Sequence, residues 1–342
     1  MKTPPLSIVL LLLCGLLNQF AFSADAPALR TSTQRPSEYE LLKSFPPEIL
    51  RRGGPDKDGN IGDNKGHWYE AGMQRGGMWY LISAVVANNS VAAEDAWRAI
   101  DATYAQQLPD GGFLSNPNPQ DPKVNTMGRI TTSFFWLNEL SHALLVVQES
   151  PFAAQFHDRI EALKPKIQKS YDFTGRDLNE LIRVHTKATN RVFIAAKAFI
   201  LGGILLGNDK LMEQGKTLLS AALKGQNQDG IFVENGGPDT SYNAVSLLEA
   251  QIILAHLENA ELETAVDHSM TWELAQIDPS NGMIDVSHNT RTGKGQETYM
   301  GHIKKVNTVE VALALCYYGV RKDKPDLLPL ALKVVKQKNM KN

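Results

Sequence analysis

Cysteine is almost absent from this chain of 342 residues, which holds only Cys14 and Cys316. Cys14 lies in an N-terminal apolar run, and loss of that run would leave Cys316 alone, with no internal disulfide to form. The fold must then depend on its apolar core, and a chain of this length can bury a large one. We expect Cys316, within LALCYYG, to be a small buried residue of that core.

An excess of one charge is also lacking, because 35 basic and 37 acidic side chains give a net charge of −2. No basic stripe or polybasic run is present, which argues against nucleic acid or an anionic membrane as a partner. The sequence has no HExxH, no paired cysteines, no GxSxG elbow, no phosphate loop and no dinucleotide fingerprint. We therefore expect no metal, no cofactor and no serine nucleophile.

The N-terminus has the form of a secretory signal. Lys2 precedes an apolar run at residues 6–17, and AFS at residues 21–23 offers small residues at the spacing of a signal-peptidase site. The run is too short for a permanent membrane anchor. We expect residues 1–24 to be cleaved, which leaves residues 25–342 as one domain in the periplasm, or secreted, with no membrane partner.

Strand signals are scarce, and long apolar segments with a period of 3.6 residues dominate the chain. Three copies of one pattern stand out: an amphipathic segment, an Asp-Gly or Asn-Gly turn, a polar loop and a richer apolar segment. The turns are LPDGGF, NQDGIF and PSNGMI. The expected inner helices are 68–88, 130–148, 192–206, 242–257 and 306–320, and their outer partners are 92–107, 152–171, 210–225, 261–276 and 327–338.

Such a repeat predicts an all-α fold of stacked helical hairpins. Five or six hairpins would close an (α/α)5–6 toroid in one domain, and an open helical solenoid is the alternative. Each loop would join an outer helix to the start of an inner helix, so the loops and several helix N-termini would share one face. Unpaired N–H groups bias that face toward anions. We expect an anionic polysaccharide as the partner.

Three acidic or amide residues have an ordinary structural interpretation. Asp110, Asp229 and Asn281 occupy the same place before a turn glycine, which favours a turn role over acid catalysis. Asp239 precedes an apolar helix as an N-cap would. Glu234 fits neither description, and both a structural role and a site role remain open for it.

The stretch HNTRTGKGQETYMGH, residues 288–302, is polar throughout. Arg291 could lower the pKa of the Tyr299 phenol, and a deprotonated tyrosine is a competent general base. His302 follows Tyr299 by three residues, so on a helix the two would share a face. The alternative interpretation is a basic loop without a catalytic role.

Aromatic, basic and amide side chains gather near the expected starts of the inner helices. Aromatic rings stack on sugar faces, while Arg and Asn bind carboxylates and hydroxyls. Tyr242 also fits a packed core aromatic, but its place in the first turn of a helix favours the open face. The expected substrate-binding residues are His67, Trp68, Arg75, Arg129, Arg191, Glu234, Tyr242 and Asn243.

With these features the chain resembles the α/α-toroid polysaccharide lyases, especially the alginate-lyase and glucuronan-lyase types. The resemblance spans the architecture of nearly all of residues 25–342, but its motifs are short. Asn190 opens NRVFIAAKAFILGG, residues 239–243 open the next helix, and Tyr299 follows Arg291 by eight residues. The family's histidine has no counterpart near Tyr242.

The resemblance implies a reaction and a set of roles. In that family Asn, His and Arg neutralise a uronate carboxylate, which stabilises an enolate-like intermediate. A Tyr removes the C5 proton and then protonates the leaving oxygen. Here Asn190 and Arg291 would neutralise the carboxylate, Tyr299 would be base and acid, and His302 or His67 would replace the family's histidine.

The expected function is therefore β-elimination in a uronate-containing polysaccharide, without a metal. One alternative is a glycoside hydrolase on the same toroid, such as an unsaturated-glucuronyl hydrolase. It would need paired carboxylates, and the candidates are Asp110, Asp229, Glu234 and Asp239. A second alternative is a protein that binds polysaccharide, or a partner protein, without catalysis.

Overall fold

The computed structural model describes residues 36–116, 125–293, 297–299 and 301–337, so the expected signal at residues 1–24 lies outside the described residues. Of the described residues, 67% are helical and 3% are in strands, which confirms the all-α prediction. The two strands, β1 (Thr298–Tyr299) and β2 (His302–Ile303), form one antiparallel pair.

Five helical hairpins make up most of the structure, and the two helices of each hairpin pack together. The repeat therefore predicted all ten helices with small errors at their ends. The hairpins are α3 (Arg75–Val86) with α4 (Ser90–Ala105), α5 (Thr126–Glu149) with α6 (Ala153–Thr174), α8 (Thr189–Leu206) with α9 (Asp209–Leu223), α10 (Thr240–His256) with α11 (Ala260–Ala275), and α12 (Thr308–Arg321) with α13 (Leu327–Gln337).

The first inner helix differs most from its prediction, because α3 begins at Arg75 instead of residue 68. The side chain of Asn64 accepts hydrogen bonds from the amides of Tyr69 (2.8 Å) and Glu70 (3.3 Å) and so holds this stretch out of a helix. A short 3₁₀ turn, η2 (Ala71–Gln74), leads into α3. Further short helices are η1 (Gly62–Asn64), η3 (Gly175–Asp177) and α7 (Leu178–His185).

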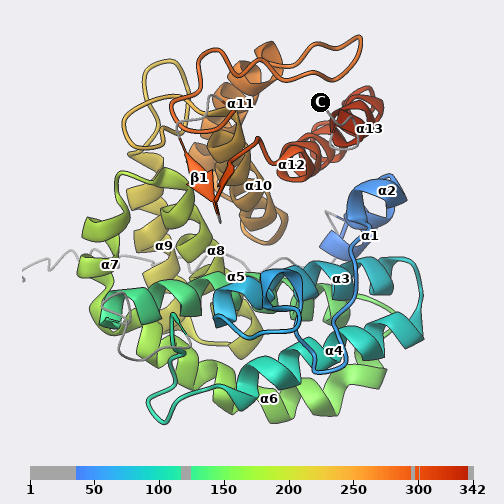
Figure 1. Cartoon of the computed structure of the whole chain (residues 1–342), viewed down its shortest axis with the longest axis vertical. Coiled ribbons are helices and arrows are strands. Elements are labelled where there is room, and N and C mark those ends of the chain that lie inside the picture. Colours follow the sequence, from blue (N-terminus) through green and yellow to red (C-terminus); the bar gives the residue numbers. More distant parts are fainter. Residues whose placement is uncertain (1–35, 117–124, 294–296, 300, 338–342) are drawn as a thin grey trace, which may run out of the picture.

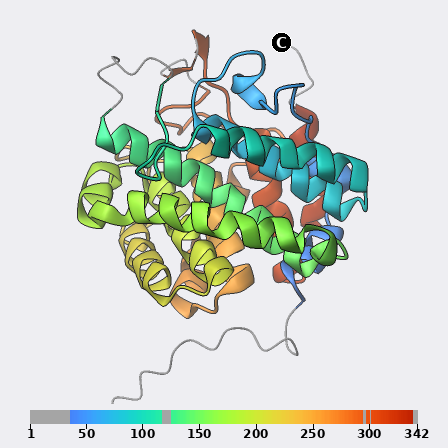
Figure 2. The ribbon, with the colours of Figure 1, turned by 90° about the horizontal axis from the view of Figure 1, so that it is seen from below.

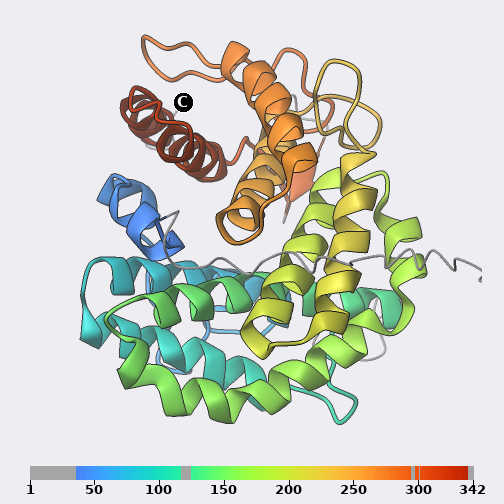
Figure 3. The same ribbon diagram turned by 180° about the vertical axis from the view of Figure 1, so that it is seen from behind.

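The hairpins follow one another around the molecule in chain order (Figure 1). Helix α3 contacts α5, α5 contacts α8, α8 contacts α10, and α10 contacts α12. Two short helices, α1 (Glu38–Lys43) and α2 (Pro47–Leu50), each contact both α12 and α3. The same succession is visible from behind (Figure 3).

The core is one continuous apolar cluster that draws on every hairpin. Helices α5, α8 and α10 are buried along nearly their whole length. Helix α8 is long and apolar enough to cross a bilayer. However, 83% of its 18 residues are buried inside the structure, as in the core helix of a globular fold. Cys316 is fully buried, as predicted.

The repeated turn is a structural device that is held by hydrogen bonds within the turn itself. In NQDGI the Asn227 amide donates to the Ile231 carbonyl, and the Asn227 side chain accepts from the amides of Asp229 and Ile231. The turn role predicted for Asp110, Asp229 and Asn281 is confirmed. A fourth copy, DKDGN at residues 56–60, has the same hydrogen bonds and was missed in the sequence because its spacing to the next helix differs.

Gly111→Ala is expected to destabilise the protein by more than about 2 kcal/mol, measured by urea unfolding. Gly111 has φ of +91°, which costs an L-residue about 1–2 kcal/mol, and an added Cβ would lie 2.2 Å from the carbonyl oxygen of Lys169 in α6. Gly207→Ala is the control, since Gly207 has φ of +61° but nothing within 4 Å of the new atom. Equal losses in the two variants would contradict the packing role.

Candidate functional site

The loops that precede α8, α10 and α12 lie against one another. Glu234 forms a β-bridge with Ala188, and the Asn235 amide donates to the Lys187 carbonyl (2.6 Å). The Thr290 amide donates to the Pro238 carbonyl (2.9 Å). Figure 2 shows the segment before α3 and the strands β1 and β2 on the same side of the molecule. The loops therefore gather on one face, as the repeat predicted.

Asp239 fixes the geometry of this face. Its side chain accepts from the amides of Ser241 (3.1 Å) and Tyr242 (3.3 Å) and so caps α10, which confirms the N-cap prediction. Its other oxygen accepts from the amides of Arg291 (3.0 Å) and Thr292 (2.8 Å). One fully buried carboxylate thus holds the backbone of Arg291 beside the first turn of α10.

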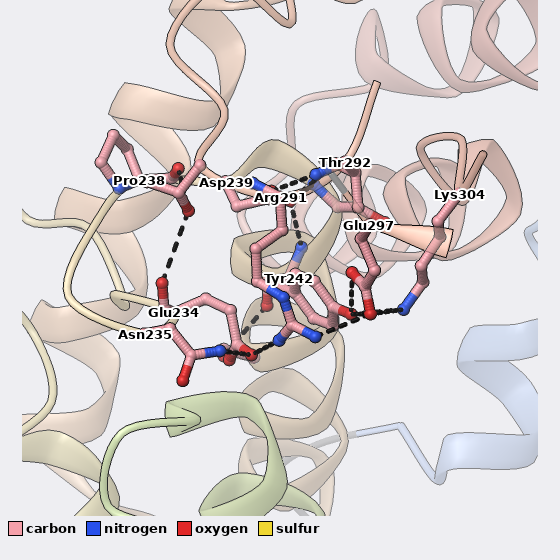
Figure 4. A network of polar contacts seen from close by, with 12 residues as sticks. Glu234, Asn235, Pro238, Asp239, Tyr242, Arg291, Thr292, Glu297 and Lys304 are labelled. Atoms are coloured by element: carbon pink, nitrogen blue, oxygen red, sulfur yellow. Dashed lines mark hydrogen bonds and ion pairs between the residues drawn. The ribbon is translucent and has the colours of Figure 1, made fainter. Parts of the chain in front are cut away.

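The Arg291 guanidinium joins two acids that are far apart in sequence (Figure 4). Its Nη1 donates to Glu234 Oε1, and its Nη2 donates to Glu297 Oε1 at 2.6 Å. The same guanidinium lies 4.7 Å from the centre of the Tyr242 ring. The structure places Arg291 on Tyr242; the predicted action of Arg291 on Tyr299 stays a prediction, because the side chain of Tyr299 lies outside the described part of the structure.

The Tyr242 hydroxyl is the centre of the cluster. It donates to Glu297 Oε2 (2.8 Å) and accepts a hydrogen bond from the Lys304 ammonium, whose Nζ also lies 4.3 Å from the ring centre. The phenol is thus flanked by two cations and one carboxylate, as Figure 4 shows. Glu297 and Lys304 were not singled out in the sequence.

Part of the cluster is open to solvent. The side chains of Arg291, Glu297 and Lys304 keep 26%, 20% and 31% of their exposure, whereas Glu234 keeps 2%. The open part of the cluster is therefore formed by Arg291, Glu297 and Lys304, whereas Tyr242, at 9% exposure, and Glu234 are buried behind it.

Burial has shifted the protonation equilibria of these groups. It raises the pKa of Glu234 to about 7, although the positive charge of Arg291 opposes the shift. Burial and the hydrogen bond to Glu297 raise the pKa of Tyr242 above its ordinary value, again against Arg291. Burial lowers the pKa of Lys304, while Glu297 opposes that change. At neutral pH the phenol is therefore neutral, and its proton points to Glu297.

Glu234→Gln is expected to weaken the pH dependence of stability between pH 4.5 and 7. A carboxyl whose folded pKa is raised contributes stability that is fully present below its unfolded pKa and is lost as pH rises through the folded value. Wild type should lose about 1–2 kcal/mol more than the variant between pH 4.5 and 7.5 in urea unfolding. Glu40→Gln, at an exposed position of α1, is the control, and an unchanged slope in Glu234→Gln would refute the assignment.

Asn190 and Arg191 adjoin the cluster. Asn190 opens α8 two residues after Ala188, the bridge partner of Glu234. It is 7% exposed, and its side-chain oxygen has no partner among the described residues. Arg191 is exposed, and its charge acts on Glu234. The structure thus brings together Asn190, Arg191, Glu234, Tyr242 and Arg291 of the predicted site.

Two predicted substrate-binding residues have structural roles. Asn243 is fully buried, because its side chain accepts from the Phe232 amide (3.0 Å) and donates to Glu273 (2.9 Å), so it does not line an open surface. Arg129 donates to both oxygens of Asp110 (2.6 and 2.8 Å) and lies 4.5 Å from the centre of the Phe173 ring. It braces the turn before α5.

The predicted pair of Tyr299 and His302 has a different geometry. The two residues are cross-strand partners in β1 and β2, so the prediction of a shared helical face is wrong. Gly301, with φ of +80°, provides the backbone conformation that a tight turn between the strands requires. His302 is exposed, and the side chain of Tyr299 lies outside the described part of the structure.

The remaining predicted residues lie before and at the start of α3. His67 is exposed, and its ring meets the exposed Tyr69 ring edge-on at 5.0 Å. Trp68 packs against the apolar core. The Arg75 guanidinium lies 4.8 Å from the centre of the Phe135 ring.

The sequence signal for the two missed residues was present but weak. Glu297 lies inside the polar stretch at 288–302, and Lys304 lies two residues beyond its end. Nothing in their spacing relates them to Tyr242, which precedes them by more than fifty residues. The pairing of β1 with β2 and the hydrogen bond from the Lys304 amide to the Glu297 carbonyl (2.8 Å) bring them together.

Among the described residues no group of three or more His, Cys, Asp or Glu side chains is arranged to hold a metal ion. Comparisons of the chain with protein-family models, curated proteins and solved structures found no match.

Proposed function

We propose that this protein is a polysaccharide lyase that cleaves a uronate-containing polymer by β-elimination, with Tyr242 as the proton-transferring group. The observation that carries the proposal is the Tyr242 phenol, held between Arg291, Lys304 and Glu297 on the face where the loops gather. Cations beside a phenol stabilise its anion, and the same cations attract a uronate carboxylate.

The proton transfers balance within this cluster. Glu297 accepts the phenolic proton along the existing hydrogen bond, and the phenolate removes the C5 proton of the sugar. The C4–O bond then breaks as the C4–C5 double bond forms, Tyr242 gives its proton to the leaving oxygen, and Glu297 returns a proton to Tyr242. The high pKa of Tyr242 makes its phenolate a strong base for this acidic carbon, at the cost of a small phenolate population.

Residues on two sides of the phenol would neutralise the carboxylate of the bound uronate. Arg291 and Lys304 provide positive charge, and the Asn190 side chain adds hydrogen-bonding capacity from α8. The carboxylate of a bound uronate would displace Glu234 or Glu297 from the Arg291 guanidinium, since both acids accept hydrogen bonds from it in the structure. These two carboxylates therefore keep the arginine positioned before substrate binds.

The proposal includes an α/α toroid of five hairpins. It is supported by the order of contacts from α3 to α12 and by α1 and α2, which contact both ends of that series. It also includes export to the periplasm, or secretion, after removal of residues 1–24. An anionic polymer outside the cytoplasm is then the partner, and nucleic acid is not.

A glycoside hydrolase is the second candidate, and one observation favours it. Glu234 and Glu297 share the Arg291 guanidinium, and burial raises the pKa of Glu234 to about 7. A protonated carboxyl near an ionised one is the arrangement that glycoside hydrolysis needs.

An absorbance assay separates these functions. The purified protein is incubated with alginate, glucuronan, pectate and glycosaminoglycans, and both ultraviolet absorbance and reducing ends are followed. New absorbance from an unsaturated uronate supports the lyase, whereas reducing ends without absorbance mean hydrolysis. Binding without either product would leave a polysaccharide-binding protein.

A further inference from the structure

A short N-terminal segment joins the first hairpin to the last. Neighbouring inner helices from α3 to α12 pack on one another, whereas the described structure shows no comparable packing of α12 on α3. Residues 37–52, here called the clasp, contain α1 and α2 and lie between these two helices (Figure 1). Helix α1 contacts α3, α5 and α12, and α2 contacts α3, α12 and α13.

Apolar side chains of the clasp enter the core of the protein. Four of them are at most 7% exposed and belong to the continuous apolar cluster: Tyr39, Leu42, Phe45 and Ile49. The Phe45 ring meets the Tyr317 ring of α12 edge-on, with their centres 5.0 Å apart. Removal of the clasp would therefore expose apolar surface both on the clasp and on the helices that it covers.

Polar contacts hold the two ends of the clasp. At one end the fully buried Glu38 pairs with His142 of α5 (2.8 Å) and His256 of α10 (2.6 Å). At the other end the Arg52 guanidinium lies 5.6 Å from the centre of the Trp79 ring of α3. Helices as short as α1 and α2 are not stable in water on their own. The clasp is therefore either docked as a whole or undocked.

The last hairpin depends on the clasp more than a central hairpin does. Helix α8 packs between α5 and α10, whereas α12 packs on α10 at one side and on the clasp at the other. Ion pairs also join Arg321 and Lys322 of α12 to Glu263 of α11, but they are partly exposed, and such pairs contribute little. Loss of the clasp would thus leave α12 with a single inner helix as its neighbour.

We propose that the clasp and the hairpin α12–α13 form one cooperative unit, which opens while α5 and α8 stay folded. The first and last hairpins separate when this unit opens. Lys304, which donates to the Tyr242 hydroxyl, lies just before α12 and moves with that helix. The cluster around Tyr242 is therefore complete only while the clasp is docked. This conformational device operates whatever reaction the cluster performs.

Amide hydrogen exchange of the intact protein, followed by mass spectrometry at several urea concentrations below the unfolding transition, tests this device. An opening that exposes one cooperative unit gives the slowest amides of that unit the same dependence on urea. We expect the slowest amides of α1, α12 and α13 to share one dependence and to exchange at least about tenfold faster than those of α5 and α8. Different dependences for α1 and α12, or exchange of both only together with α5 and α8, would overturn the proposal.

Two matched variants test which helices open together. Phe45→Leu shortens a buried side chain of the clasp, and Phe199→Leu shortens a buried side chain of α8 that meets Tyr171 of α6. Phe45→Leu should speed exchange in α1, α12 and α13 by one common factor of at least about fivefold. Phe199→Leu should leave exchange in these helices within about twofold of wild type and speed it in α5 and α8, because α8 stays folded in the open state.

Two results from the variants would contradict the cooperative unit. One is faster exchange in Phe45→Leu that is confined to the turn of α12 around Tyr317, which would mean local packing alone. The other is an equal increase in α8 and α12 in Phe199→Leu, which would mean that α12 opens only in global unfolding. The urea series on the wild-type protein decides the question if either variant fails to fold.

Discussion

Tyr242→Phe is expected to lower kcat on a uronate polymer by about 10²–10⁴-fold, the range typical of lost acid–base catalysis. The substitution removes the hydroxyl that donates to Glu297 and accepts from Lys304. It keeps the aromatic ring that contacts the Arg291 guanidinium. Initial rates of unsaturated-uronate absorbance measure the loss. Because the phenylalanine ring still fills the space, the midpoint of thermal unfolding should move by only a few degrees.

Two further tyrosines sharpen this test. Tyr318→Phe also removes a hydroxyl bound to a carboxylate, Asp267 (3.0 Å), with Lys324 4.9 Å from the ring centre, but Tyr318 belongs to α12 and its carboxylate partner to α11. Its activity should stay within about twofold of wild type. Tyr299→Phe tests the tyrosine to which the family resemblance assigns the role of base. Full activity in Tyr242→Phe together with loss in Tyr299→Phe would assign proton transfer to Tyr299.

The helical architecture could be predicted because each repeat carries its own local signals. The turn glycines, the caps and the apolar period all act over fewer than twenty residues, so α5, α8, α10 and α12 were placed within a few residues of their observed ends. The start of α3 was missed because the Asn64 side chain, several residues upstream, binds the amides of Tyr69 and Glu70. Such a side-chain contact leaves no periodic pattern in the sequence, so residue spacing does not predict it.

The candidate site was predicted only in part, for a related reason. Arg291, Glu234 and Tyr242 were each recognised as residues of the loop face, but their partners were not. Asp239 holds the amide of Arg291 across 52 residues of sequence, and that bond brings the guanidinium to the Tyr242 ring. Spacing along the chain pointed to Tyr299 because Tyr299 is nearer in sequence.

The least predictable feature is a buried network of charged side chains that joins the inner helices. Glu38 of α1 is fully buried and pairs with His142 of α5 (2.8 Å) and His256 of α10 (2.6 Å), and it accepts a hydrogen bond from Tyr317 of α12. A second group, Glu139, Lys197 and Glu249, continues it across α5, α8 and α10. One side chain of a six-residue helix therefore contacts three of the five hairpins.

Glu38→Ala is expected to lower the free energy of unfolding by about 3–5 kcal/mol, because it leaves a buried cation without its partner. Burial disfavours the charged form of Glu38, but His142 and His256 outweigh it and lower the pKa of this carboxyl. Urea unfolding at pH 6 measures the loss. Glu40→Ala is the matched control two residues away, since Glu40 is exposed and pairs with the exposed Lys43 (2.9 Å), and it should cost at most about 0.5 kcal/mol.

The pH dependence shows whether the loss is electrostatic. Burial opposes the charge on His142, yet Glu38 and Glu139 raise the pKa of this histidine to about 9. Its contribution to stability is therefore complete below about pH 6.5, the ordinary value, and is lost as pH rises through about 9. Wild type should lose stability across that interval, and Glu38→Ala should lose less, because the acid that raises the pKa is gone. Parallel curves for the two proteins would mean that Glu38 contributes by packing, and that the contact of α1 with α5, α10 and α12 does not depend on charge.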